Sequence, residues 1–158
     1  MAGKYTLVWT GIEAPLLEIA HAIVDGGRLR ARGTQIGVEP SPYELRYELD
    51  GSRLAVEVVG GPQRELTLEQ HDFFDLERSP LFNSLPAFRD GVHRGGDPRD
   101  YVMAFVEVPS LDVRPSEQRY EPLEPGLVRF TSGSFTADLV FDAEGFVVQY
   151  PGLAERVS

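Results

Sequence analysis

Hydrophobic and polar residues alternate over residues 117–153 in the manner of back-to-back β-hairpins. One face of the central strand carries Phe135, Ala137, Leu139 and Phe141, and the other carries Thr136, Asp138 and Asp142. Such a period of two is the signature of a strand whose two faces meet different environments. A turn at residues 142–145 then returns the chain. The returning strand places Phe146, Val148 and Tyr150 on the apolar face, and Pro151-Gly152 ends it. The pattern predicts an antiparallel sheet with one apolar face.

The same alternation recurs in the N-terminal half. Residues 5–10 alternate around Trp9 and predict an opening strand. The hairpin of residues 43–58 turns at Asp50-Gly51, a dipeptide that favours the positive φ angles of a tight turn. Residues 64–69 and 101–108 read as further strands. A meander of antiparallel strands is therefore expected through most of the chain.

Two segments are less clear from the pattern. Residues 14–24 fit a helix, with apolar side chains three and four apart, and equally a strand. Residues 28–39 continue as an extended segment, in which Gly33 and Gly37 suggest bulges or bends. Residues 79–91 differ from both, because Ser79-Pro80 has the form of a helix N-cap followed by proline at the first helical position. A short helix is predicted there.

Composition indicates one domain spanning residues 1–158. The formal net charge of -10 argues against nucleic acid as a partner, since phosphates would be repelled. Cysteine is absent, which excludes disulfides, thiolate catalysis and thiolate metal sites. No apolar stretch approaches the roughly 20 residues of a membrane span, and the N-terminus shows no apolar signal-peptide core. We therefore expect a cytoplasmic protein without stable membrane insertion.

Candidate chemistry is sparse. His21, His71 and His93 lack the spacing by which one element presents two imidazoles to a metal, and no metal ligand or cofactor is assigned. There is no nucleophile elbow, phosphate-binding loop or dinucleotide fingerprint. Carboxylate pairs for glycoside chemistry could be drawn from Glu18, Glu57, Glu117, Asp138 and Asp142, although most of these should face solvent on alternating strands. No catalytic residue is assigned, and a binding protein is favoured over an enzyme.

Aromatic residues occur in nearly every expected element. The simplest interpretation is a shared core. The alternative is a curved sheet that leaves part of its apolar face as a cavity, with Trp9, Tyr47 and Tyr120 turning polar atoms toward a ligand. Sequence does not separate a filled core from a lined pocket.

Specific motifs resemble the bacterial family known as putative glycolipid-binding proteins. They are EQRY at residues 117–120 and FTADLVFDAEGFVVQYPGL at residues 135–153, supported by GTQIGVE at 33–39, PYELRY at 42–47 and NSLP at 83–86. The resemblance implies a mainly β fold, a spiral β-roll in which a long, curved, mostly antiparallel sheet wraps around one short helix, similar to the lipoprotein carriers LolA and LolB, and a homodimer. On that model residues 14–24 become a strand and residues 79–91 the central helix. The chain departs from the family pattern in being short between Val58 and Tyr101 and in lacking a second tryptophan there.

Three functional hypotheses follow. The first is non-enzymatic binding of a glycolipid or fatty-acyl compound between the concave sheet and the helix. Its candidate ligand-binding residues are Trp9, Glu18, Tyr47, Phe82, Gln118 and Tyr120. The second is a dimerisation or protein-interaction module without a small-molecule ligand. The third is a hydrolase using Glu18 or Asp138 with a nearby histidine.

Overall fold

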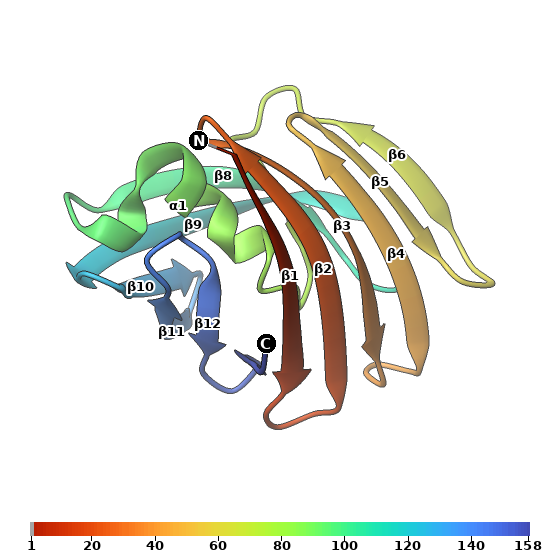
Figure 1. Ribbon diagram of the computed structural model, residues 1–158. Coiled ribbons are helices and arrows are strands. Elements are labelled where there is room, and N and C mark those ends of the chain that lie inside the picture. Colours follow the sequence, from red (N-terminus) through yellow and green to blue (C-terminus); the bar gives the residue numbers. More distant parts are fainter. Residues whose placement is uncertain (1) are drawn as a thin grey trace.

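The computed structural model describes residues 2–158 and shows a single curved sheet of 13 strands together with short helical segments (Figure 1). The strands are β1 (Ala2–Gly11), β2 (Leu16–Asp25), β3 (Arg28–Gly37), β4 (Tyr43–Asp50), β5 (Arg53–Val58), β6 (Gln63–Thr67), β7 (Phe73–Leu76), β8 (Arg99–Val106), β9 (Val113–Glu124), β10 (Leu127–Ser132), β11 (Phe135–Phe141), β12 (Val147–Tyr150) and β13 (Ala154–Arg156). The helical segments are the 3₁₀ turn η1 (Phe82–Ser84), the helix α1 (Leu85–Asp90) and the 3₁₀ turn η2 (Val92–Arg94). The predicted mainly β fold with one short helix is confirmed.

The order of strands in the sheet explains why it must curve. The order is β6-β5-β4-β3-β2-β1-β13-β12-β11-β10-β9-β8-β7, so the chain starts in the middle, reaches one edge at β6, and continues at the opposite edge in β7. Twelve spacings of about 4.8 Å would separate the edges of a flat sheet by about 58 Å. Residues 68–72 join β6 to β7, and a connection of that length reaches at most about 21 Å. The sheet therefore rolls until its two ends face each other.

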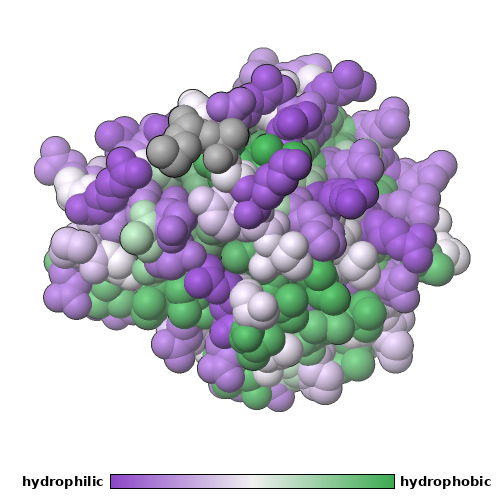
Figure 2. Space-filling model, viewed as in Figure 1, coloured by the Kyte–Doolittle hydropathy of each residue, from purple (hydrophilic) through white to green (hydrophobic). Residues whose placement is uncertain are grey.

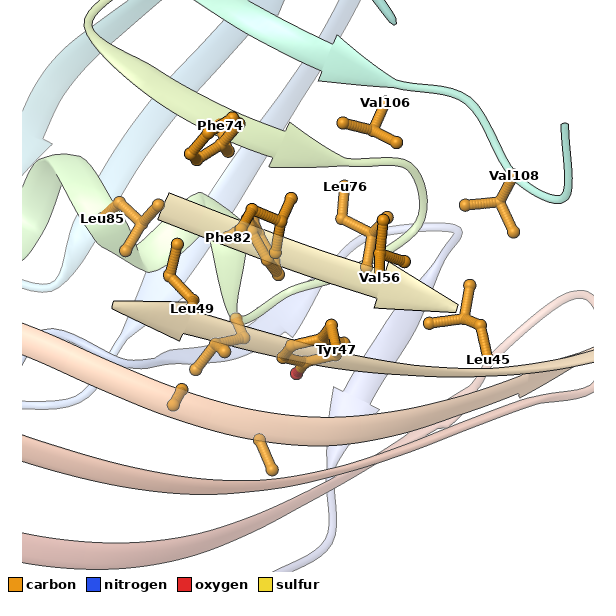
Figure 3. Packing of buried hydrophobic residues seen from close by; sticks show 14 of the residues in the cluster. Leu45, Tyr47, Leu49, Val56, Phe74, Leu76, Phe82, Leu85, Val106 and Val108 are labelled. Carbon is orange, nitrogen blue, oxygen red and sulfur yellow. The ribbon is translucent and has the colours of Figure 1, made fainter. Parts of the chain in front are cut away.

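Side chains fill the space between those two ends (Figure 3). Phe74 and Leu76 of β7 belong to the same buried apolar cluster as Leu45 of β4 and Val56 of β5. The ring of Phe82 in η1 meets Tyr47 edge-on, with 5.2 Å between ring centroids. A second buried cluster covers the inner face of β8 to β12, and Phe73 packs against both clusters.

Residues 14–24, which fitted helix or strand equally well, form most of strand β2. Its alternating burial, with Leu16, Glu18, Ala20 and Ala22 buried, matches pairing with β1 on one side and β3 on the other. Gly33 and Gly37 suggested bulges or bends in β3, and no bulge occurs there, since the register with β2 and β4 runs without a shift. Gly33 instead lies under the Tyr47 ring, and any Cβ there would collide with the ring and with the carbonyl oxygen of Ile19.

The helix is shorter than predicted. Ser79 was expected to cap it, but α1 begins only at Leu85, and the Ser79 hydroxyl donates to the carboxylate of Glu18 instead. The N–H of Ser79 donates to the carbonyl of Leu76, so residues 76–79 form a turn after β7. Gly91, with φ of 68°, ends α1 in the left-handed conformation that glycine adopts readily.

The last hairpin contains a bulge that the alternation did not reveal. Val140 pairs with Gln149, whereas the next residue, Phe141, pairs with Val147, so Val148 is an extra residue in β12. The bulge shifts the alternation, and Val147 is fully buried where Val148 was expected to be. Strands β7 and β13 were also not predicted. Strand β7 pairs with β8 in parallel, and a parallel pair has no hairpin turn from which the sequence could predict it. No helix in the described part of the chain is long and apolar enough to cross a membrane.

Candidate functional site

A buried polar network lies between the concave sheet and the helical segment. The sequence analysis predicted a ligand-binding site in this region. Glu18 and Gln35 are cross-strand neighbours on β2 and β3, and both are fully buried. The Glu18 carboxylate accepts hydrogen bonds from Gln35 Nε2 (3.0 Å), from the Tyr47 hydroxyl (3.0 Å) and from the Ser79 hydroxyl (2.7 Å). The Tyr43 hydroxyl in turn donates to Gln35 Oε1 at 2.6 Å. The network thus ties β2, β3 and β4 to the turn after β7.

Burial dominates the electrostatics of this network. It raises the pKa of Glu18 to about 7, and the surrounding hydrogen-bond donors only partly oppose the shift. Burial together with the Glu18 charge raises the pKa of Tyr47 well above its usual value. The polar atoms of Glu18 and Tyr47 are engaged with protein partners, and Phe82 lies in the apolar cluster beside them. Around Glu18, Tyr47 and Phe82, the space between the sheet and the helical segment is filled with side chains.

Two further candidates are also engaged in the core. The Trp9 indole N–H donates to the main-chain oxygen of Val147 at 2.8 Å, and the side chain is fully buried. The Tyr120 hydroxyl accepts from Asn83 Nδ2 at 3.1 Å and is likewise fully buried. Neither Trp9 nor Tyr120 turns its polar atom toward a cavity. Gln118 has a different position, because it lines a pocket.

That pocket, called here the inner-face pocket, has a volume of about 550 Å³. It lies between the inner side of β7 to β11 and the turn that joins β12 to β13. It is lined by Glu13, Asp75, Glu77, Arg78, Asn83, Phe105, Arg114, Ser116, Gln118, Phe130, Ser132, Phe135, Tyr150, Pro151, Gly152 and Leu153. A smaller pocket of about 230 Å³ shares Glu13, Arg78, Gly152 and Leu153 with it and adds the apolar residues Ala14, Pro15, Leu16 and Val38. The two pockets are therefore adjacent.

Aromatic rings form the apolar wall of the inner-face pocket. Phe130, Phe135 and Tyr150 pack with their centroids 6.2 to 6.3 Å apart. Phe130 continues into the core through Tyr120 at 5.2 Å. Phe135 is 47% exposed, which is unusual for a phenylalanine fixed by neighbouring rings. The wall is thus closely packed at its base and exposed at its rim.

A buried carboxylate and amide form the polar floor. Gln118 Nε2 donates to Asp75 Oδ2 at 2.6 Å and to Ser116 Oγ at 3.3 Å. Asp75 is 7% exposed and Gln118 is 4% exposed. Burial raises the pKa of Asp75 to about 6, against the opposing hydrogen bond from Gln118. Perturbed carboxylates in clefts are candidates for functional groups.

Comparison with known proteins assigns the chain to a family. The family model described as putative glycolipid-binding matches residues 57–156. The chain belongs to this family. A crystal structure of a DUF1089 family protein from Pseudomonas aeruginosa is similar, with a TM-score of 0.57 and 23% sequence identity over 99% of this chain and 92% of that chain. At this level of identity, the likeness shows the fold. No match was found among curated proteins.

The matched span of the putative glycolipid-binding family contains β6 to β13 and almost the whole inner-face pocket, with Glu13 outside it. Glu18 and Gln35 of the buried network lie before the span. Sequence reasoning selected Gln118 but missed Asp75. The available signal was a charged residue inside the apolar run Phe73-Phe74-Asp75-Leu76, the kind of buried polar group that calls for a partner.

Asp138 and the histidines considered for hydrolysis lie outside the lining of the inner-face pocket. Asp138 lies on the outer side of β11 and pairs with Arg129 at 2.9 Å. Among the described residues, no histidine is hydrogen-bonded to Glu18 or to Asp138, and no cluster of metal-ligating side chains is found within residues 2–158. His21 bonds to Thr6 at 3.2 Å on the outer face of the sheet.

Proposed function

We propose that the protein binds an amphipathic molecule, a glycolipid or a related compound, in the inner-face pocket and does not transform it. The observation that carries this proposal is the composition of the pocket wall, which passes from the exposed ring of Phe135 to the buried pair Asp75 and Gln118. Ligand sites typically combine an apolar wall with a few fixed polar groups in this way. Membership of the putative glycolipid-binding family supports the same ligand class.

The exposed apolar surface of the inner-face pocket indicates where the apolar part of the ligand binds. Covering Phe135 and Tyr150 removes apolar area from water, worth about 25 cal/mol for each Å². The adjacent smaller pocket, with Pro15, Leu16 and Val38, offers further apolar surface for a chain. The polar floor then faces the headgroup. A cytoplasmic location, expected from the sequence, belongs to this proposal and would make the ligand a cytoplasmic one.

Titration with octyl glucoside below its critical micelle concentration tests the proposal. We expect saturable binding by calorimetry, weakened about tenfold by Phe135→Ala, which corresponds to about 1.4 kcal/mol. The ring is half-exposed, so its removal should leave the fold intact. Leu123→Ala, which removes a comparably exposed side chain on β9 outside the pocket, is the matched control. Absence of binding, or equal binding by the Phe135 variant and the wild type, would contradict the proposal.

A second candidate, a homodimer, is favoured by an apolar patch on the outer face of the sheet. Across β13, β1, β2 and β3 the outward side chains are Val157, Val8, Ile12, Leu17, Ile19 and Ile36. Figure 2 shows hydrophobic residues gathered over the lower part of these strands. Ile12, Ile36 and Val157 are 44%, 40% and 59% exposed. Two copies of such a patch could cover each other across a two-fold axis.

Sedimentation velocity at micromolar concentration tests the dimer. We expect a dimer for the wild type and a monomer for Ile36→Lys combined with Val157→Lys. Val102→Lys, at a 37% exposed site on β8, is the control and should remain dimeric. A monomeric wild type would remove this candidate and leave the ligand-binding proposal untouched.

A further inference from the structure

The polar floor of the inner-face pocket presents acceptors without matching donors. Both hydrogens of the Gln118 amide are used, toward Asp75 and Ser116. Its oxygen, Oε1, is buried and has no hydrogen-bond partner among residues 2–158. A buried acceptor without a donor is costly, and natural proteins rarely leave one unless something else occupies the site.

Asp75 adds a second acceptor to the floor. Gln118 is the hydrogen-bond donor found for its carboxylate among the described residues. A carboxylate can accept about four hydrogen bonds, so its capacity is mostly unused. Because burial raises the pKa of Asp75 to about 6, the group is still mainly ionised at neutral pH.

The cations in the pocket wall are already occupied. Arg78 pairs with Glu77 at 3.3 Å and donates to the main-chain oxygens of Glu39 and Val108 at 2.8 and 3.2 Å. Arg114 bonds to Glu107 at 2.9 Å, and its guanidinium lies over the ring of Phe105. Each guanidinium is therefore already paired with a carboxylate of the protein.

We infer that the ligand's headgroup is a hydrogen-bond donor without negative charge, held by Asp75 and Gln118 Oε1, and that the pocket rejects anionic headgroups. This inference rests on the proposed function and specifies its ligand. The hydroxyls of a sugar and an ammonium group share the required chemistry. A phosphate or sulfate would instead place acceptors against the Asp75 carboxylate, and like charges at close range in a poorly solvated site repel strongly.

Three amphiphiles with the same octyl chain separate these cases: octyl glucoside, octylammonium chloride and sodium octyl sulfate, each titrated below its critical micelle concentration at pH 7.5. We expect octyl sulfate to bind at least tenfold more weakly than the better of the other two. The tighter binder of those two shows whether the donor is a sugar hydroxyl or an ammonium group. Octyl sulfate binding as tightly as both would overturn the inference.

Asp75→Asn tests the residue itself. The amide has nearly the same shape and no charge to bury, so the fold should be retained. We expect octylammonium to lose affinity, octyl sulfate to gain it, and the difference between octyl glucoside and octyl sulfate to shrink. Unchanged ratios among the three probes would overturn the inference.

Two further measurements separate this inference from the proposed function. Phe135→Ala should weaken all three probes by a similar factor, because it removes only the apolar contact. In the wild type, lowering the pH below 6 should reduce the discrimination against octyl sulfate as Asp75 takes up a proton. If no probe bound, the proposed function and this inference would both fail, whereas equal binding of all three that depended on Phe135 would overturn the inference alone.

Discussion

At the scale of single residues, Glu18 makes the strongest prediction about stability. Its pKa is about 7 in the folded protein against 4.5 for the ordinary side chain, so the folded state binds more protons between these two values. The free energy of unfolding should therefore fall as the pH rises from 4.5 to 7 and level off above. A shift of this size corresponds to about 3 kcal/mol. Asp75 acts in the same direction, and His93, whose pKa burial lowers, acts in the opposite one.

Glu18→Gln isolates the contribution of Glu18. The amide can keep the hydrogen bond from Gln35 but carries no charge. The difference in free energy of unfolding, variant minus wild type, should therefore increase by about 3 kcal/mol from pH 4.5 to pH 8. Urea unfolding followed by circular dichroism measures this difference. Glu65→Gln, at an exposed position on β6, serves as the matched carboxylate-to-amide control. Parallel pH profiles for wild type and Glu18→Gln would show that Glu18 does not titrate in this range.

At the scale of elements, the sequence predicts hairpins well because both of their determinants are local. The strand of residues 43–50, its Asp50-Gly51 turn and the returning strand appear as β4 and β5 with an unshifted register. Alternation sets the faces, and the turn residues set the register. In β11 the predicted apolar residues Ala137, Leu139 and Phe141 are buried in the same way.

Elements whose form depends on distant partners were not predictable in this manner. Strand β7 is short and pairs in parallel with β8. The bulge in β12 depends on how that strand meets β11. Ser79 looked like a helix cap in isolation, yet its hydroxyl bonds to Glu18, 61 residues earlier in the chain. The sequence around Ser79 does not show that Glu18 competes with a helix N-terminus for this hydroxyl.

The same distinction holds for the candidate site. Gln118 could be selected from a motif, but its role as a neighbour of Asp75 depends on the order of β7, β8 and β9 in the sheet. Gly33 suggested a bulge or a bend, whereas its missing side chain leaves room for the Tyr47 ring that reaches Glu18. In both cases the sequence drew attention to the residue, but only the tertiary contact explains why that residue type is needed at that position.

At the scale of the whole molecule, the rolled sheet brings two buried clusters into contact. The strands of the two halves meet at β1 and β13 in the middle of the sheet. Phe73 packs against both clusters, and the Trp9 indole N–H reaches the oxygen of Val147 in β12. Destabilising either cluster should therefore loosen both together, as expected for a domain that unfolds in two states.

Leu139→Ala tests this coupling from the cluster that does not contain Trp9. Leu139 is fully buried on β11, so the substitution should cost about 2 to 5 kcal/mol. Because Trp9 is the single tryptophan, its fluorescence reports on the other cluster, and circular dichroism reports on the whole sheet. We expect the fluorescence and circular dichroism transitions in urea to coincide and to shift together. Leu123→Ala, at a 41% exposed position, should shift neither. A fluorescence transition that stayed at the wild-type midpoint while part of the circular dichroism signal was lost earlier would mean that the two halves of the roll unfold independently.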